Sequence, residues 1–273
     1  MRSAMRVPFI KMHGLGNDFV VLDSRSQALP PVDARIAAAL ADRRTGIGCD
    51  QLVLIEPSAV ADLKMRIFNP DGSEVGACGN ASRAVALLQG EPCTIETGGG
   101  LIEARPADVG IAVNMGKPRF GWDAIPLAYA MDTLSMPVGW EELENPVAVN
   151  VGNPHAVFFV PDTDAVELDR LGPLIENDPL FPERVNVNVA TVTGPASIRL
   201  RVWERGAGLT RACGTGACAT AVAAMRRGLT GRSVEVILPG GPLTIDWAQD
   251  GTIVMTGPAA ESFRGDFAWS DFA

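Results

Sequence analysis

The chain has 273 residues, of which 47% are hydrophobic, enough to form a core in one large domain or in each of two ordinary ones. It carries 23 basic and 32 acidic side chains, and its net charge of −9 would repel a polyanion, so nucleic acid is not an expected partner. No apolar run approaches the roughly 20 residues of a membrane span, and the first residues lack the apolar stretch of a signal peptide. We therefore expect a soluble, cytoplasmic protein with no membrane partner.

The sequence predicts both strands and helices in each half of the chain. Runs of valine, isoleucine and leucine predict strands at residues 20–22, 52–55, 156–160 and 198–202. A helix is expected from Asp33 to Arg43, with Asp33 as its N-cap and Ile36, Ala37 and Leu40 on its buried side. Alanine-rich stretches predict two more helices, at 80–88 and 215–227, which end at Gly90 and Gly228. Segments 116–127 and 257–266 are rich in glycine, proline and charge, which favours an interlobe crossing and a final crossing.

Similar motifs recur in the two halves of the chain. Cys78 and Cys213 stand 135 positions apart in the similar stretches Ala-Cys-Gly-Asn-Ala and Ala-Cys-Gly-Thr-Gly. Other landmarks recur in the same order and near the same offset: Asn17 with Asn153, Gln51 with Asn186, and Asn69 with Glu204. An ordered series of this kind indicates an internal duplication into two similar α/β lobes. We expect an N-terminal lobe at 1–120, a C-terminal lobe at 121–261 and a tail, 262–273, that packs back on the first lobe.

The five cysteines have no regular spacing and form no CxxC motif, so a disulfide scaffold is not expected. Only two histidines are present, and Cys213 and Cys218 are separated by four residues, which is a poor fit to a zinc site; we predict no metal. Cysteine is among the most buried residue types, and Cys49, Cys93 and Cys218 are expected to be inert core thiols.

Cys78 and Cys213 differ from the other three because each precedes or opens a predicted helix. A helix N-terminus lowers the pKa of a thiol and binds a carboxylate through its unpaired N–H groups. Two such ends facing each other would hold a substrate carboxylate and leave the adjacent carbon between two sulfurs. This arrangement suits removal of a proton from one face of the carbon and its return on the other, which inverts the centre.

Several long motifs resemble the diaminopimelate epimerase family over nearly the whole chain. They are Lys11–Phe19, Gly46–Gln51, Phe68–Glu74, Gly152–His155, Phe181–Asn186 and Glu204–Gly208, together with both cysteine motifs. The resemblance implies an α/β (α+β type) fold of two pseudo-symmetric lobes, each a mixed, mostly antiparallel β-sheet wrapped around a central helix, with the active site at the lobe interface. It also implies an isomerase that needs no cofactor, pyridoxal phosphate included. The implied reaction interconverts LL- and meso-2,6-diaminopimelate in lysine and peptidoglycan biosynthesis.

The resemblance also assigns roles to individual residues. Cys78 and Cys213 would transfer the protons, and His155 and Glu204 would tune the pKa values of the thiols. The substrate-binding residues would be Asn17, Gln51, Asn69, Gly79, Asn80, Asn153, Asn186, Glu204, Arg205, Gly214 and Thr215. Arg205 has no charged counterpart in the first lobe, where Pro70 takes its place, and a guanidinium suits the far carboxylate of an elongated substrate.

Four alternative functions are also compatible with the sequence. A cysteine hydrolase would use Cys213 with His155 but leaves Cys78 without a role. A thiol redox protein would cycle Cys78 and Cys213 through a disulfide, and a non-catalytic amino-acid binder would use the same fold. Related racemases or isomerases share the doubled fold, although the Glu204-Arg205 pair argues against them. A homodimer is also left open.

Overall fold

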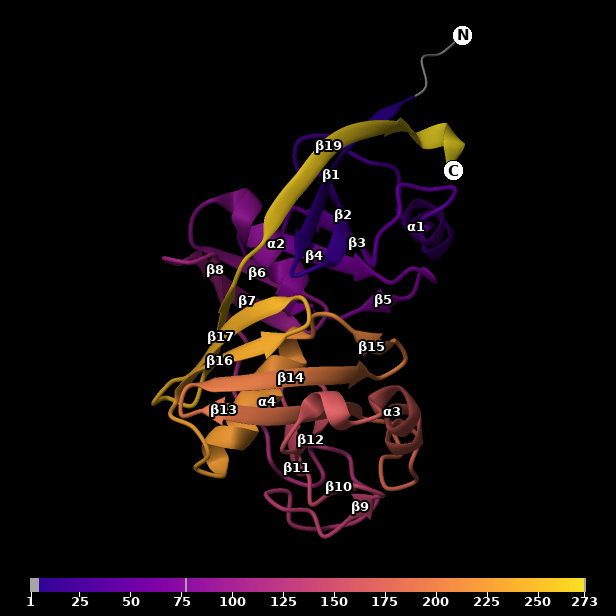
Figure 1. Cartoon of the computed structure of the whole chain (residues 1–273). Coiled ribbons are helices and arrows are strands. Elements are labelled where there is room, and N and C mark those ends of the chain that lie inside the picture. The colour runs from indigo at the N-terminus through magenta and orange to yellow at the C-terminus, as the bar shows by residue number, and fades with distance from the viewer. Residues whose placement is uncertain (1–4, 77, 273) are drawn as a thin grey trace. The chain divides into compact units, whose positions relative to one another are not determined.

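The computed structural model describes residues 5–76 and 78–272. The chain divides into two compact units: unit 1 comprises Met1–Val113 with Gly257–Ala273, and unit 2 comprises Asn114–Thr256. Figure 1 shows the strands and helices of each unit. Among the described residues, no helix is both long enough and apolar enough to cross a membrane.

Unit 1 is built on a mixed sheet that begins with a tight hairpin. The turn residues Leu15 and Gly16 both have positive φ, 58° and 88°, as a type I′ hairpin turn requires. The first two strands are antiparallel, the second and third are parallel, and most later pairs are antiparallel. The strands are β1 (Arg6–Gly14), β2 (Asn17–Asp23), β3 (Gln51–Glu56), β4 (Leu63–Phe68), β5 (Glu74–Val75), β6 (Cys93–Thr97), β7 (Gly100–Pro106), β8 (Ile111–Asn114) and β19 (Ala260–Ala268).

Two α-helices belong to unit 1. α1 (Ala34–Ala41) is capped by Asp33, whose side chain accepts a hydrogen bond from Ile36 N, as predicted. α2 (Gly79–Gln89) follows Cys78 and ends at Gly90, whose φ of 73° gives the left-handed cap expected of a glycine. The buried face of α2 includes Arg83, and the helix contacts β1, β6, β7 and β19. The short 3₁₀ helix η2 (Trp269–Asp271) closes the described chain.

Unit 2 repeats the strand order of unit 1. β11 and β12 are antiparallel, β12 and β13 are parallel, β13 and β14 are antiparallel, and β14 is parallel to β16. The same sequence of pairings links β1, β2, β3, β4 and β6. The strands are β9 (Gly139–Trp140), β10 (Leu143–Glu144), β11 (Val147–Asn150), β12 (Pro154–Phe159), β13 (Asn186–Gly194), β14 (Ser197–Glu204), β15 (Gly208–Thr210), β16 (Ser233–Leu238), β17 (Gly241–Trp247) and β18 (Ile253–Gly257).

The central helix of unit 2 is α4 (Gly214–Arg226), which follows Cys213. It is buried from Gly216 to Ala224 and contacts strands β11 to β14, β16 and β17. The small side chains that predict this helix also let strands approach it on several sides. The fold class predicted from the sequence is thus confirmed: the chain forms two similar α/β lobes, each with a helix inside a mixed, mostly antiparallel sheet.

Two elements differ from the sequence predictions. Segment 257–266, predicted only as a final crossing, is mostly regular: it forms the greater part of β19, which pairs with β1 from Ala268 to Ala260. The second element is α3 (Leu168–Glu176), which was not predicted and follows the 3₁₀ helix η1 (Thr163–Ala165). α3 packs on β13 to β15, and Leu168, Leu171 and Ile175 join the core of unit 2.

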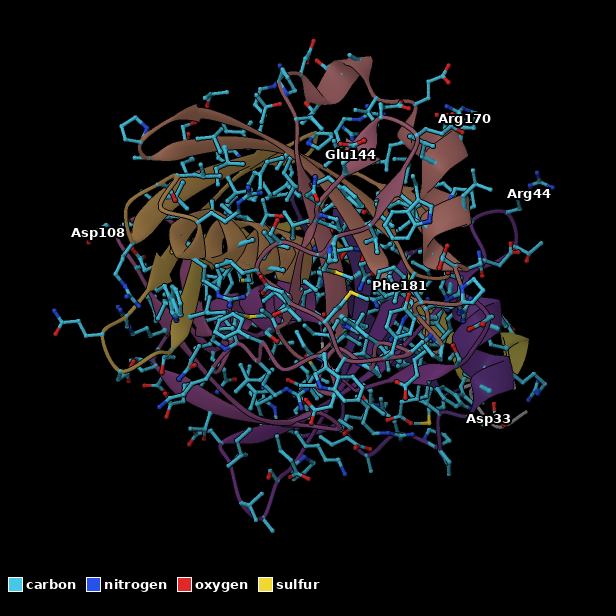
Figure 2. The ribbon with its side chains drawn as sticks, turned by 90° about the horizontal axis from the view of Figure 1, so that it is seen from below. Asp33, Arg44, Asp108, Glu144, Arg170 and Phe181 are labelled. Carbon is cyan, nitrogen blue, oxygen red and sulfur yellow. The ribbon has the colours of Figure 1, made fainter. Side chains whose placement is uncertain are left out.

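Figure 2 shows Arg170 on α3 and Phe181 just after it. Arg170 donates hydrogen bonds to Glu141 and Glu167 at the surface. Phe181 is buried and stacks on Trp140, with ring centroids 6.0 Å apart. The helix therefore joins an exposed ionic face to the apolar core.

Candidate active site

In unit 1, Cys78 stands directly before α2, at the position where backbone N–H groups lack helical partners. Its backbone is extended, with φ −147° and ψ 114°, and the residue is half-buried. Gly79 and Asn80 form the first turn of the helix. Their N–H groups lie at the positive end of the helix dipole, which suits a carboxylate.

A directed chain of hydrogen bonds connects Asn80 to the first hairpin. Arg83 Nη2 donates to Asn80 Oδ1 over 2.9 Å, and Asn80 Nδ2 donates to Asn17 Oδ1 over 3.1 Å. Asn17 Nδ2 then donates to Asp50 Oδ2 over 3.1 Å. A guanidinium can only donate and a carboxylate can only accept, so the two ends of the chain fix the orientation of both amides.

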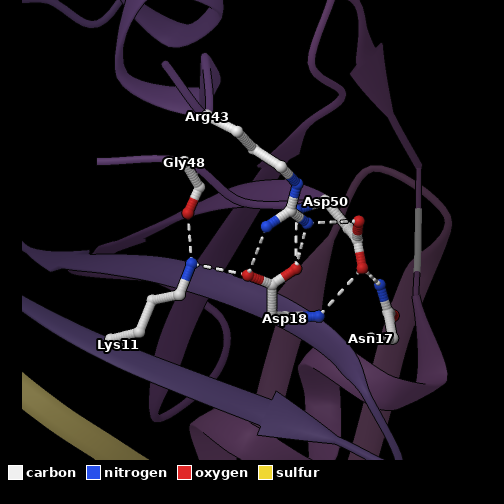
Figure 3. A network of polar contacts seen from close by, with 6 residues as sticks. All are labelled: Lys11, Asn17, Asp18, Arg43, Gly48 and Asp50. Atoms are coloured by element: carbon white, nitrogen blue, oxygen red, sulfur yellow. Dashed lines mark hydrogen bonds and ion pairs between the residues drawn. The ribbon is translucent and has the colours of Figure 1, made fainter. Parts of the chain in front are cut away.

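Asp50 belongs to an ionic network around the start of β2 (Figure 3). Its Oδ2 also accepts from Asp18 N at 3.0 Å, and its Oδ1 accepts from Arg43 at 2.7 Å. Arg43 and Lys11 both bind the Asp18 carboxylate, and Lys11 donates to Gly48 O as well. Burial alone would raise the pKa of Asp18, but the hydrogen bonds from Arg43 and Lys11 hold that pKa well below its ordinary value.

Gln51 and Asn69 form a second polar pair in unit 1. Gln51 opens β3, and its Nε2 donates to Asn69 Oδ1 over 3.3 Å. Asn69 Nδ2 in turn donates to Ser73 Oγ across a turn that contains Gly72 at φ 84°. Within the described residues, Gln51 Oε1 is buried with no hydrogen-bond partner. A buried amide oxygen of this kind is suited to accept a hydrogen bond from a ligand.

In unit 2, Cys213 takes the position before α4 that Cys78 takes before α2. Its side chain is buried, with 3% exposure, and its Sγ accepts from Gly216 N over 3.3 Å. Thr215 Oγ1 lies 3.6 Å from the sulfur, and the Glu204 side chain is also hydrogen-bonded to it. A side chain at position 216 would be tightly confined, because a Cβ there would lie 3.0 Å from Val202 and 3.2 Å from Cys213 Sγ.

The helix end lowers the thiol pKa of Cys213 through the Gly216 N–H, as predicted, but other effects outweigh this contribution. Burial, followed by the Glu204 carboxylate, raises the pKa of Cys213 well above its ordinary value. The hydrogen bond from Gly216 N–H lowers this pKa by less than the loss of water around the thiolate raises it. Burial also raises the pKa of Glu204, whose Oε1 accepts from Thr210 Oγ1 at 2.5 Å. Cys213 is therefore held as a thiol.

His155 connects to Cys213 through two side chains. Its Nε2 lies 2.9 Å from Asn153 Oδ1, and Asn153 Nδ2 lies 3.3 Å from Thr215 Oγ1. The other ring nitrogen, Nδ1, lies 3.2 Å from Asn188 Oδ1. The ring is fully buried, and burial lowers the pKa of His155 to about 4, with a smaller contribution from the charge of Arg205. His155 is therefore neutral at physiological pH.

Asn186 and Arg205 are joined through the backbone of the turn after β14. Asn186 Nδ2 donates to Pro154 O over 2.8 Å, and Asn186 Oδ1 accepts from Arg205 N over 2.9 Å. The exposed Arg205 guanidinium donates to Glu183 O over 2.8 Å. The turn is further held by Glu176, whose Oε1 accepts from Gly206 N at 2.9 Å.

These contacts thus join Asn17 to Asn80 at the start of α2, and Asn153, Glu204 and Thr215 to one another or to Cys213 at the start of α4. Gln51 with Asn69, and Asn186 with Arg205, form separate polar pairs. Three positions that the sequence analysis did not single out hold these residues in place: Asp50, Asn188 and Glu176. Asp50 lies within a motif that carries the family resemblance, so a signal was present but no role was assigned. Cys49 and Cys93 are buried as predicted, and burial raises the pKa of Cys49 to about 11.

Comparison with known proteins identifies the family. The family model described as diaminopimelate epimerase matches residues 9–121 and 147–261. The chain belongs to the diaminopimelate epimerase family. It is 70% identical to the diaminopimelate epimerase of Erythrobacter litoralis over 98% of this chain and 100% of that one. It is 56% identical to that of Zymomonas mobilis, again over 98% of this chain and 100% of that one. The chain is therefore an isomerase of the epimerase class.

Solved structures extend this epimerase fold to more distant proteins. A hydroxyproline epimerase from Agrobacterium vitis superposes with a TM-score of 0.70 at 16% identity, covering 100% of this chain and 94% of that one. A Bacillus anthracis phenazine biosynthesis protein gives 0.69 at 16% identity, covering 96% and 99%. At such identities the likeness concerns the fold alone. Among the described residues, no group of three or more histidine, cysteine and acidic side chains is arranged to hold a metal ion.

Proposed function

We propose that this epimerase interconverts LL- and meso-2,6-diaminopimelate, with Cys78 and Cys213 as the two proton-transfer residues. One observation carries the proposal: each lobe of the repeated fold begins its central helix directly after one of these cysteines, and Cys213 is a buried thiol against Glu204. Family membership, with relatives named for this substrate, supports the choice of diaminopimelate. The same proposal includes a role for the reaction product in lysine and peptidoglycan biosynthesis.

In this mechanism both helix ends hold the carboxylate beside the reacting carbon. The N–H groups of Gly79, Asn80, Gly214 and Thr215 stabilise the negative charge that develops when the α-proton leaves. One sulfur takes the proton while the other delivers its own proton to the opposite face, so the C–H bond breaks on one side and forms on the other. The scheme needs no cofactor because both proton carriers are side chains of the protein.

The remaining polar residues would line the substrate site and bind the other groups of the substrate. Asn17, Gln51 and Asn69 in unit 1 and Asn153, Asn186 and Glu204 in unit 2 offer amide and carboxylate groups for its amines and carboxylate. Arg205 supplies the charge for the distal carboxylate, and its guanidinium is already exposed and oriented by Glu183 O. A bidentate clamp at this position favours a dicarboxylate over an ordinary amino acid.

The test is solvent-deuterium exchange at the α-carbon of diaminopimelate, followed by chiral analysis, without added cofactor. We expect exchange with inversion in the wild-type enzyme. Cys78→Ala and Cys213→Ala should each lose at least about 10³-fold of the epimerisation rate, because one proton carrier is missing. Cys93→Ala, which removes a buried thiol elsewhere in unit 1, is the matched control and should keep activity. Full epimerisation in either catalytic variant would refute the two-cysteine mechanism.

The same assay separates the alternatives. A hydrolase would release a new product instead of an epimer, and a redox protein would need an oxidant to change either thiol. A non-catalytic binder would show neither exchange nor inversion. Exchange on proline derivatives, and none on diaminopimelate, would point to a related racemase.

A further inference from the structure

The hydrogen bonds around His155 contain a conflict when the ring is neutral. Both ring nitrogens face amide oxygens, Nε2 that of Asn153 at 2.9 Å and Nδ1 that of Asn188 at 3.2 Å. A neutral imidazole has one N–H donor and one acceptor, so it can satisfy only one of these oxygens. One of the two amides must therefore present its nitrogen to the ring.

Asn188 cannot be the amide that turns. Its Nδ2 donates to Gly216 O over 3.0 Å and to Thr220 Oγ1 over 3.0 Å. A backbone carbonyl only accepts, so rotation would bring two oxygens together at a position with 0% exposure. Asn188 Oδ1 therefore faces the ring in either protonation state, and His155 Nδ1 carries the proton that binds it.

Asn153 is free to turn because its other partner is a hydroxyl. Thr215 Oγ1 lies 3.3 Å from the Asn153 amide and serves equally as donor or acceptor. With Nδ1 protonated, the bare Nε2 accepts from Asn153 Nδ2, and Asn153 Oδ1 then accepts the Thr215 hydroxyl proton. Thr215 consequently turns its lone pairs toward Cys213 Sγ, 3.6 Å away.

We propose that Asn188 is a positioning residue that fixes His155 as the Nδ1–H tautomer and, through Asn153 and Thr215, keeps the proton on Cys213 in the substrate-free enzyme. The Thr215 oxygen and the Glu204 carboxylate both face the sulfur as acceptors, and neither stabilises a thiolate. A proton added to His155 would reverse the relay: Nε2–H would donate to Asn153, Asn153 to Thr215, and Thr215 to a Cys213 thiolate. The charge of Arg205 disfavours a protonated His155 ring, and the Glu204 carboxylate disfavours a thiolate at Cys213.

This inference rests on the proposed function for its catalytic meaning. If Cys213 holds the proton at rest, Cys78 is the base of the free enzyme and Cys213 the acid. Cys213 then gives its proton to the α-carbon, the S–H bond breaks as the new C–H bond forms, and the sulfur is left as thiolate. The free enzyme is thus prepared for one direction of the reaction, and turnover leaves it prepared for the other.

The relay is tested first by NMR of the substrate-free enzyme labelled with ¹⁵N in the histidine rings. The chain has only two histidines, His13 and His155, so a His13→Gln variant assigns the spectrum by difference. At pH 7.5 we expect His155 to be neutral with its proton on Nδ1. A ring protonated on Nε2 alone, or on both nitrogens, would overturn the proposal.

The second measurement is the rate of iodoacetamide alkylation of each cysteine, read by peptide mapping. Cys78 should be alkylated before Cys213 in the wild type. Asn188→Asp has nearly the same volume but stabilises the imidazolium, so it should protonate His155 and raise the Cys213 rate at least about fivefold. Thr133→Val, which removes a buried hydrogen bond to Phe120 O elsewhere in unit 2, should change neither the tautomer nor the rate ratio.

The outcomes are distinguishable from failure of the proposed function. If Asn188→Asp does not fold, the wild-type tautomer still decides the first step. Preferential alkylation of Cys213, or an unchanged Cys213 rate in a folded Asn188→Asp variant with a protonated ring, would refute the relay. A wild-type enzyme with the expected tautomer but without α-deuterium exchange would instead refute the epimerase proposal.

Discussion

At the scale of single residues, the orientation of the Asn17 and Asn80 amides depends on the two ends of their hydrogen-bond chain. Arg83 donates at one end, and Asp50 accepts at the other. Each amide uses one of its N–H bonds within this series of hydrogen bonds. The direction of the series therefore decides which amide atoms remain for a ligand. Asp50 is therefore a positioning residue in our proposal, although it sits behind Asn17 in the ionic network.

We predict that Asp50→Asn raises the KM for diaminopimelate about tenfold, with a smaller change in kcat. The substitution replaces an acceptor-only carboxylate with an amide, so Asn17 is no longer held in one orientation, and the loss of a charged hydrogen bond corresponds to roughly 1.5 kcal/mol. Steady-state kinetics in both directions measure the effect. Asp62→Asn is the control, because Asp62 also accepts from a backbone N–H and a hydroxyl, those of Thr94, at an exposed position. Equal KM values for Asp50→Asn and the wild type would remove Asp50 from this role.

At the scale of elements, α3 links the core of unit 2 to the turn that carries Arg205. Glu176, at the end of the helix, is buried with 5% exposure. Its Oε2 accepts from Trp203 Nε1 at 2.7 Å, and its Oε1 accepts from Gly206 N at 2.9 Å. Both carboxylate oxygens are thus used to hold β14 and the turn that follows it.

We predict that Glu176→Gln destabilises the protein by about 1–3 kcal/mol and weakens substrate binding. A glutamine presents only one acceptor oxygen, so either Trp203 Nε1 or Gly206 N loses its partner. Chemical unfolding gives the stability, and the KM reports the looser Arg205 turn. Glu167→Gln is the matched control, since Glu167 binds only exposed groups at the start of the same helix. A variant that keeps both the wild-type stability and the wild-type KM would contradict this role.

The elements also show how far the sequence determines the fold. The helices after Cys78 and Cys213 are predictable because small residues form them and glycines end them. α3 is missed because Gly172 and Pro173 lie inside it, and both are poor helix formers. Gly172 is required by packing: a Cβ there would lie 2.4 Å from the ring of Trp203. A tertiary contact of this kind leaves no periodic signal in the sequence.

The residues of the candidate site also differ in how far the sequence predicts them. Residues with a ligand-facing role, such as Asn153 and Arg205, lie in motifs that can be recognised. Residues that act on other side chains, such as Asn188 and Asp50, become visible only when the strand register is known. Asn188 reaches His155 because β12 and β13 run parallel with His155 opposite Asn186, a pairing that joins residues 31 positions apart in sequence.

At the scale of the whole molecule, the buried ring of His155 gives the stability of the protein a specific pH dependence. In the unfolded chain this ring has a pKa of about 6.5, whereas in the folded protein burial lowers the pKa to about 4. Between these values the unfolded state binds more protons than the folded state, so acid favours unfolding. The contribution is fully present above pH 6.5 and is lost as the pH falls toward 4.

The wild-type protein should lose about 3 kcal/mol of unfolding free energy through His155 between pH 6.5 and pH 4, since a difference of about 2.5 pKa units corresponds to that amount. We predict that the His155→Gln variant does not show this loss. Urea unfolding at several pH values measures it. Tryptophan fluorescence is a suitable probe because four of the five tryptophans, at 122, 140, 203 and 247, lie in unit 2 with His155. The difference in unfolding free energy between the wild type and His155→Gln should become smaller by that amount as the pH falls. Thr133→Val changes no titratable group, so its difference in unfolding free energy from the wild type should not depend on pH. A pH-independent difference for His155→Gln would mean that His155 is not buried as a neutral ring.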